Sequence, residues 1–514
     1  MPTLEWIGKD KVINHHQEVP YRILDKKYTY NAESSENMII HGDNLLALKS
    51  LLPQFEGKVD CIYIDPPYNT GNEKWVYNDN VNDPKIKKWL GEVVGQEGED
   101  LTRHDKWLCM MYPRLKLLYK LLSNDGVIFI SIDDNELASL KLICDEIFGK
   151  NLVCTLVWET KKEAKGIPPV RMCVTNQEYI LVYSKTNAYR FIGDLRKIED
   201  GFINPDNDPR GPWKRQYLQR FGQGFSERTI INPENGMSFT FETPYTEEKM
   251  NQWIAEGVII FPQEATKYPA RKEFFYEYDN PYKPIVTSLG LYSTKVNSEK
   301  LKDIFDGEKV FDYSKPIGLI LDLLKKSTKK NFLILDSFAG SGTTAHAVLD
   351  LNKQDGGNRK FILVEMMDYA DTITAERVKR VIDGYGEGNK AVAGLGGDFS
   401  YYELGEPLFK DDKNLNEAVG EEEIRKYVYY METKQPLEEN TADTRYYLGK
   451  HNDTAYYFYY EKDKPTTLNR EFLATVKTKA TGYLIYADIC TLSAETLSQN
   501  GIVFKKIPRD IQKL

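Results

Sequence analysis

The chain has 514 residues, of which 41% are hydrophobic and 28% charged, a globular balance that suits about three domains. No run of about 18 uncharged apolar residues occurs, so a membrane span is not expected, and the N-terminus lacks the features of a secretory signal. The net charge of −9 argues against a protein that coats nucleic acid non-specifically, although one locally basic groove remains compatible with it. The six cysteines form no CxxC pair, which favours a cytoplasmic protein without disulfides or a metal site.

Strands and helices are predicted to alternate over the first part of the chain. Residues 1–36 are polar and are interpreted as an irregular N-terminal arm. Residues 69–105 are rich in Asn, Asp, Gly and Lys, which indicates a long loop of the kind that often serves as a lid. Strands are expected at 38–43, 59–64, 126–132, 153–158 and 178–183, and helices at 44–52, 107–122 and 135–148. This alternation indicates an α/β fold with a mostly parallel sheet.

The alternation stops at residues 185–290, which are rich in Pro, Gly, Asn and aromatic residues, so an inserted domain is expected there. It resumes with helices at 314–326, 342–351 and 372–385 and strands at 332–335 and 360–364. Residues 384–397 then contain six glycines, which predict a flexible linker over residues 386–400. The remainder, 401–514, is expected to be a separate α+β module with tyrosine-rich strands such as residues 455–460.

The first motif with a chemical meaning is the segment DSFAGSG at residues 336–342, directly between a strand and a helix. Its glycines permit a tight turn and a close approach of the backbone to a ligand. The next strand ends in Glu365, an acidic residue where ribose hydroxyls are commonly held. No lysine follows Gly342, and Ala345 replaces the third glycine of a dinucleotide loop. The segment is therefore interpreted as a binding loop for an adenosine-containing cofactor without a phosphate, with S-adenosylmethionine as the candidate. The alternative is a generic tight turn that binds no ligand.

The second motif is Asp65-Pro66-Pro67-Tyr68, which ends the strand at residues 59–64. Two prolines cannot continue a central strand, so the motif is expected in the crevice at the strand ends. The Asp65 carboxylate and the Pro66 carbonyl form two acceptors suited to an exocyclic amino group, and Tyr68 offers a face for stacking a base. The alternative is an ordinary turn with an exposed aromatic residue.

Together the two motifs resemble those of the amino-methylating DNA methyltransferases. DPPY precedes FAGSG here, as in the permuted beta group of that family, whose target-recognition region lies between the two halves. The resemblance implies a Rossmann-like sheet with a catalytic half at 37–184, a target-recognition insertion at 185–290 and a cofactor-binding half at 291–385. Residues that match the family's cofactor positions are Asp43, Lys315 and Pro316 of a KP motif, Asp336, Phe338, Gly340, Gly342 and Glu365.

A narrower resemblance is to the modification (Mod) subunits of type III restriction–modification systems. It is carried by DPPYNTGN at residues 65–72, followed by YND at 77–79, by RHDKW at 103–107, and by residues 504–511. The resemblance implies double-stranded DNA as substrate, a homodimer, and a translocase and nuclease (Res) subunit as partner. An orphan enzyme, or one from another system, is the alternative.

The family resemblance also implies the chemistry. The target base is flipped out of the duplex, and its amino nitrogen attacks the cofactor's methyl group directly, without a covalent enzyme intermediate or a metal. Asp rather than Ser at position 65 favours adenine over cytosine. The alternatives are a methyltransferase for cytosine, RNA or protein amides, and a DNA-specificity protein that has lost catalysis.

Contacts to DNA are expected where basic side chains alternate with aromatic ones. The best candidate segment lies in the inserted region, and a second lies in the RHDKW stretch; a solvated loop is the alternative reading of the first. The candidate residues are Trp213, Lys214, Arg215 and Arg220 in the first segment and Arg103 and Lys106 in the second.

Overall fold

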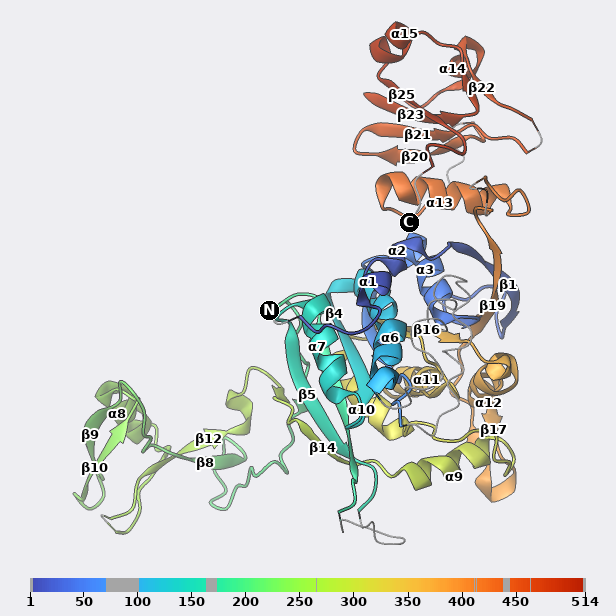
Figure 1. The fold of residues 1–514 in the computed structure, drawn as a ribbon. Coiled ribbons are helices and arrows are strands. Elements are labelled where there is room, and N and C mark those ends of the chain that lie inside the picture. Colours follow the sequence, from blue (N-terminus) through green and yellow to red (C-terminus); the bar gives the residue numbers. More distant parts are fainter. Residues whose placement is uncertain are drawn as a thin grey trace. The chain divides into compact units, whose positions relative to one another are not determined.

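The computed structural model describes residues 3–70, 101–162, 173–264, 266–410, 412, 414–437, 444–462 and 464–511. The chain divides into two compact units, one made of Met1–Arg190 and Val286–Leu514 and the other of Phe191–Ile285 (Figure 1). Each unit has its own hydrophobic core. Within the described ranges, no helix combines the length and the apolar character needed to cross a membrane.

The first unit is built on a ten-stranded sheet with the order β1-β19-β2-β16-β15-β3-β4-β6-β5-β14. The strands from β19 to β4 run parallel to one another, whereas β1 and β6 pair antiparallel with their neighbours. The strands are β1 (Arg22–Tyr30), β2 (Met38–His41), β3 (Val59–Ile64), β4 (Leu122–Ile132), β5 (Leu152–Glu159), β6 (Gln177–Ser184), β14 (Ser288–Leu291), β15 (Leu333–Asp336), β16 (Lys360–Glu365) and β19 (Phe399–Pro407). The predicted α/β class is confirmed.

Helices cover the central strands because those strands are apolar on both faces. Ile62 and Ile64 of β3 join the core that includes α3, α6 and α7, while Cys61 and Tyr63 point to the opposite face and are equally buried. In Figure 1, α6 and α7 lie side by side, and α10 packs against α11. The helices of this part are α1 (Lys9–Val12), α2 (His15–Glu18), α3 (Asn44–Phe55), α6 (Leu101–Leu121), α7 (Leu137–Phe148), α9 (Thr294–Ile304), α10 (Ile317–Ser327), α11 (Thr343–Asp355) and α12 (Glu376–Asp383).

The C-terminal module carries a four-stranded sheet of order β20-β21-β23-β25, with helix α13 (Glu421–Thr433) before it. Helix α13 packs against α3, and the Tyr430 hydroxyl donates a hydrogen bond to Glu56 at the end of α3. Many of the tyrosines predicted in packed strands lie in its cores. The remaining elements here are β20 (Tyr447–His451), β21 (Thr454–Phe458), β22 (Thr467–Leu468), α14 (Arg470–Thr475), β23 (Gly482–Ala487), β24 (Ile489–Cys490), α15 (Ala494–Gln499) and β25 (Ile502–Lys506).

The second unit is small and mostly β (green in Figure 1). Its core gathers aromatic side chains, including those of Trp213, Phe239 and Trp253. The strand β8 (Trp213–Tyr217) pairs with β12 (Ala270–Phe274), which pairs with β11 (Ile259–Ile260). The other elements are the hairpin of β9 (Ser226–Ile231) and β10 (Ser238–Thr243), helix α8 (Glu247–Ala255), and the paired β7 (Asp194–Leu195) and β13 (Tyr282–Lys283).

Two expectations about chain ends and linkers are wrong. The N-terminal arm is not irregular, because it forms α1, α2 and the edge strand β1. The expected linker at 386–400 contains the short strand pair β17 (Gly384–Tyr385) and β18 (Val392–Ala393), and the sheet strand β19 begins at its end. Charged residues on β1 hid this strand, since an edge strand keeps polar side chains in solvent.

Three smaller differences concern the catalytic half. The strands expected at 153–158 and 178–183 form an antiparallel pair, so this end of the sheet is mixed. Of the loop expected at 69–105, residues 71–100, including YND at 77–79, lie outside the described residues, and α6 already begins at residue 101. Lys315 precedes α10, which begins at Ile317 with Pro316 at its N-cap, because proline fits best at the start of a helix, where its missing N–H leaves no helical hydrogen bond unmade.

Candidate active site

The sequence motifs follow four neighbouring strands of the sheet. In the order β2-β16-β15-β3, the strands end in residues that lead to Asp43, Glu365, the loop at 336–342 and the loop at 65–68. All four strands are parallel, so these carboxyl-terminal ends lie at one edge of the sheet. Ligands of open α/β sheets bind at this edge. The structure therefore brings the two motifs together although about 270 residues separate them in the sequence.

The loop at 336–342 owes its shape to two glycines. Gly340 and Gly342 have φ angles of 51° and 79°, in the left-handed region that other residues rarely adopt. A Cβ atom at Gly342 would lie 3.1 Å from the carbonyl oxygen of Thr374. Asp336 fixes the start of the loop: its carboxylate accepts hydrogen bonds from the Phe338 amide at 3.0 Å and from the Thr344 hydroxyl at 2.5 Å. The two glycines are therefore required by the shape of the turn and by its close packing against the rest of the protein.

Glu365 faces this loop from the end of β16. Its carboxylate accepts hydrogen bonds from the amides of Gly340 at 2.7 Å and Met367 at 3.0 Å, and the residue is 2% exposed. Burial raises the pKa of Glu365 to about 7, against the lowering effect of these hydrogen bonds. Burial likewise raises the pKa of Asp336 to about 7, and the nearby charges of Asp65 and Glu365 add to the shift. Carboxylates are crowded at this edge.

Asp43 lies at the end of β2 but is partly engaged by its own helix. One carboxylate oxygen accepts from the amides of Leu45 and Leu46 and so caps α3. The other lies 3.5 Å from a guanidinium nitrogen of Arg114. Arg114 also bonds to Asn44, whose side-chain amide donates to the Ser337 carbonyl at 2.8 Å. Asp43 is thus placed beside the loop at 336–342, and Asn44 and Arg114 are structural links that the sequence analysis missed.

The carboxylate of Asp65 is incompletely paired. Lys315 Nζ lies 3.2 Å from Asp65 Oδ1 as an ion pair, yet no residue that the structure describes donates a well-formed hydrogen bond to this buried oxygen. Burial raises the pKa of Asp65; the charge of Lys315 opposes this, and that of Glu178 adds to it. A buried acceptor without a donor is costly. Such an atom is typical of a site that receives a donor from its substrate.

Lys315 stands between the two motifs and joins them. Its ammonium group contacts Asp65, donates to the Tyr68 hydroxyl at 2.6 Å and to Glu178 at 2.9 Å, and lies 4.5 Å from the centre of the Tyr68 ring. Burial lowers the pKa of Lys315, but the charges of Asp65 and Glu178 outweigh this and raise it. Lys315 was predicted beside the cofactor; the structure shows its contacts on the DPPY side.

Glu178 is a site residue that the sequence analysis missed. It accepts a hydrogen bond from the Tyr68 hydroxyl at 2.9 Å, which fixes the orientation of the ring. Its position in the sequence could have indicated a role, because Glu178 is the single acidic residue of β6 and lies near the start of this mostly apolar strand.

The expected DNA contacts differ in exposure. Trp213 is 5% exposed and its indole N–H donates to Asp206, so it belongs to the core and its assignment as a DNA contact is corrected. Lys214 pairs with Glu273 at 3.3 Å. Arg215 and Arg220 are exposed. Buried strand residues of small β units are often aromatic, which is why the pattern misled.

The RHDKW stretch lies in the first turns of α6, where Arg103 and Lys106 are half-buried. Its His104 and Trp107 side chains turn inward toward the catalytic loop, where Trp107 Nε1 donates to the Pro67 carbonyl at 2.7 Å. The segment is therefore not simply a basic surface.

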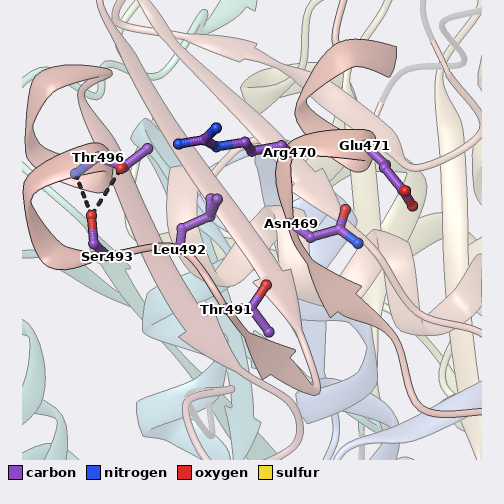
Figure 2. A pocket seen from close by; sticks show the side chains of 7 residues that line it. All are labelled: Asn469, Arg470, Glu471, Thr491, Leu492, Ser493 and Thr496. Carbon is purple, nitrogen blue, oxygen red and sulfur yellow. Dashed lines mark hydrogen bonds between the residues drawn. The ribbon is translucent and has the colours of Figure 1, made fainter.

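A separate pocket in the C-terminal module contains none of the motif residues (Figure 2). Asn469 and Ser493 in its lining cap α14 and α15 by accepting from the amides of Phe472 and Thr496, and Figure 2 shows the Ser493–Thr496 bonds. Asn469 and Ser493 are thus engaged by the two short helices that they cap. The lining residues are Asn469, Arg470, Glu471, Thr491, Leu492, Ser493 and Thr496.

The fold and the two loops agree with the family to which the sequence belongs. The family model described as DNA methylase (N6_N4_Mtase) matches residues 59–376, a range that contains both motifs. The chain belongs to this family, and the predicted family resemblance is confirmed.

Several curated proteins are similar over most of the chain. The type III restriction-modification enzyme StyLTI Mod subunit of Salmonella typhimurium is 33% identical over 79% of this chain and 66% of its own length. The EcoPI Mod subunit of Escherichia phage P1 is 35% identical over 71% of this chain and 63% of its own length. The type II methyltransferase M.KpnI of Klebsiella pneumoniae is 31% identical over 65% of this chain and 81% of its own length. The chain thus spans slightly less than two thirds of the two Mod subunits.

Proposed function

We propose that the chain transfers a methyl group from S-adenosylmethionine to the exocyclic N6 amino group of adenine in double-stranded DNA. The observation that carries this proposal is the buried Oδ1 of Asp65 at the strand edge beside the glycine loop, where the ion pair with Lys315 at 3.2 Å leaves it without a well-formed hydrogen bond among the described residues. An amino group of a flipped base supplies such a donor. Membership in the DNA methylase family and similarity to the Mod subunits and to M.KpnI support the same reaction.

The residues at the ends of β15 and β16 fit S-adenosylmethionine. Glu365 offers a buried carboxylate to ribose hydroxyls, and the left-handed glycines Gly340 and Gly342 shape the adjoining loop that we expect to contact the cofactor. The loop has no lysine for a phosphate, and Asp43 lies at the neighbouring strand end for contacts to the adenine. When bound, the group supplies an electrophilic methyl on a sulfonium.

The protein's part in the reaction is positioning. Asp65, together with the Pro66 carbonyl, accepts hydrogen bonds from the amino group of adenine and so directs the nitrogen lone pair toward the methyl carbon. The N–C bond forms as the S–C bond breaks, and the extra proton on nitrogen then passes to Asp65, whose raised pKa suits it to receive one, and on to water. The Lys315 ammonium contacts the hydroxyl end of Tyr68, and we expect the base to stack on the ring of Tyr68.

We further propose that this chain is the modification and specificity subunit of a type III restriction–modification system, acts as a homodimer, and works with a Res subunit. The similarity to the named Mod subunits supports this. The order of the motifs supports a permuted beta-group enzyme, and the position of the unit Phe191–Ile285 between them supports a target-recognition insertion. In that unit the exposed Arg215, Tyr217, Arg220 and Phe221 combine the charge and the stacking surface that DNA contacts need.

The test is modification-sensitive sequencing of DNA from a host that expresses the chain alone. We expect one methylated motif, N6-methyladenine in digested nucleosides, and tritium transfer from labelled cofactor to DNA. Asp65→Asn should slow transfer by roughly 10²–10³-fold, whereas Asp312→Asn, at a carboxylate that is 66% exposed, should not. Finding N4-methylcytosine instead would identify cytosine as the target base. Sequence-specific DNA binding without methyl transfer would identify the chain as a DNA-specificity protein without catalytic activity.

A further inference from the structure

The start of α6 holds the catalytic loop at two points. Trp107 Nε1 donates to the Pro67 carbonyl at 2.7 Å. His104 Nδ1 lies 2.6 Å from Glu136 Oε1, and the same oxygen accepts a hydrogen bond from the side-chain amide of Asn69. His104 and Trp107 are three positions apart, so both lie on one face of the helix. This face of α6 therefore contacts Pro67 directly and is linked to Asn69 through Glu136.

Glu136 is a buried carboxylate that links the catalytic loop to α6. Its side chain is 0% exposed, and burial raises its pKa, an effect that Asn69, His104 and Ser139 oppose. It occupies the N-cap position of α7 but makes no capping hydrogen bond to that helix. A buried carboxylate is tolerated only when it is well paired. Its carboxylate oxygen Oε1 bonds instead to Asn69 of the catalytic loop and to His104 of α6.

Asn69 needs such a restraint. It follows Tyr68 directly, is 0% exposed, and has a φ angle of 61° in the left-handed region. Asn tolerates this conformation better than most residues, but it still costs free energy unless surrounding contacts hold it. The bond to Glu136 provides that contact at the position where the loop leaves the site.

We propose that His104, Glu136 and Trp107 are positioning residues that set the conformation of the loop at 65–69, and with it the placement of Asp65 and Tyr68. The inference rests on the proposed methyl transfer, and it assigns a role to the RHDKW stretch. None of the three residues needs to touch the base or the cofactor. Their effect reaches the reaction through the Pro67 carbonyl and the Asn69 side chain.

The first test compares His104→Ala with His104→Asn. Asparagine carries a nitrogen at the place of Nδ1 and can donate to Glu136, whereas alanine cannot. In single-turnover methyl transfer we expect His104→Ala to be roughly ten- to hundredfold slower and His104→Asn to stay within about threefold of the unchanged protein. The dissociation constant for S-adenosylmethionine should stay within about twofold in both, because the cofactor loop is not altered. His451→Ala, in the C-terminal module, is the matched control.

The second test measures how well the loop at 65–69 is held in place, and it does not depend on methyl transfer. Hydrogen–deuterium exchange of the amides of Asp65, Tyr68, Asn69 and Thr70 should be about tenfold or more faster in His104→Ala and in Trp107→Phe, and unchanged in His104→Asn and His451→Ala. Unchanged exchange in both His104→Ala and Trp107→Phe would overturn the proposal. So would transfer rates of these two variants within twofold of an active unchanged protein. An unchanged protein that transfers no methyl group would instead refute the proposed function, and the exchange experiment would still decide the role of the contacts.

Discussion

The buried carboxylate of Glu365 makes cofactor affinity depend on pH under the proposed function. Burial raises its pKa from an ordinary 4.5 to about 7, and the ionised form is the better acceptor for ribose hydroxyls. If only the ionised form binds, the apparent Kd is proportional to 1 + 10^(pKa − pH), which falls roughly tenfold between pH 6 and pH 8. Affinity therefore rises with pH, because the free protein carries a proton at low pH that the complex does not.

Isothermal titration of S-adenosylmethionine at pH 6, 7 and 8 measures this slope. Glu365→Gln should bind S-adenosylmethionine more weakly at pH 8, and its Kd should lack the pH dependence that comes from the carboxyl group. Ionisation of the ligand's own amino group affects both proteins equally. Asp336→Asn is the control, because Asp336 also has a pKa raised to about 7 but bonds to Phe338 and Thr344 inside the loop. The reasoning is refuted if Glu365→Gln shows the same slope as the unchanged protein.

Three further predictions concern other buried groups. Lys315→Met removes the cation beside Asp65, so the acidic limb of the rate–pH profile should move up by at least about one unit, whereas Lys309→Met, in an exposed ion pair, should leave it in place. Lys49 is 1% exposed, and burial lowers its pKa to about 7. Because the unfolded chain keeps this proton until a higher pH, the folded state gains stability as the pH rises. The free energy of unfolding measured in urea should therefore rise between pH 7 and 9 by roughly 2 kcal/mol more in the unchanged protein than in Lys49→Met. Gly342→Ala should lower stability by about 1–2 kcal/mol and weaken cofactor binding, and equal melting temperatures would contradict the strain at its φ of 79°.

The central strands could be predicted from the sequence because they are buried on both faces. Runs such as residues 59–64 are apolar apart from Asp60, and the residues that follow them break the strand, so both the strands and the motif positions at their ends are local signals. The local pattern does not say which strands are neighbours. That both loops lie on one sheet was implied by the family resemblance, and the structure confirms that β3 and β15 are adjacent.

The missed features depend on contacts between distant segments. β1 pairs with β19, whose residues lie 369–385 positions away in the sequence, and the charged residues of β1 look like those of an arm. Glu178 and His104 are single polar residues whose roles follow only from the side chains opposite them, at positions 68 and 136. The prediction that Trp213 contacts DNA was wrong for the converse reason. An aromatic residue beside basic ones is as consistent with a small hydrophobic core as with a binding surface.

The charge at the strand edge leads to a last prediction about ligand preference. Asp65, Asp336 and Glu365 lie close enough that the charges of Asp65 and Glu365 raise the pKa of Asp336, and Lys315 compensates only on the Asp65 side. Such an edge favours a cationic sulfonium over a neutral thioether. We therefore expect the protein to bind S-adenosylmethionine more tightly than S-adenosylhomocysteine, and the ratio to shrink in Asp65→Asn but not in Asp312→Asn. Competition titrations measure both ratios; a ratio that Asp65→Asn leaves unchanged would mean that this carboxylate does not sense the ligand's charge and lies farther from the methyl donor than the proposed transfer requires.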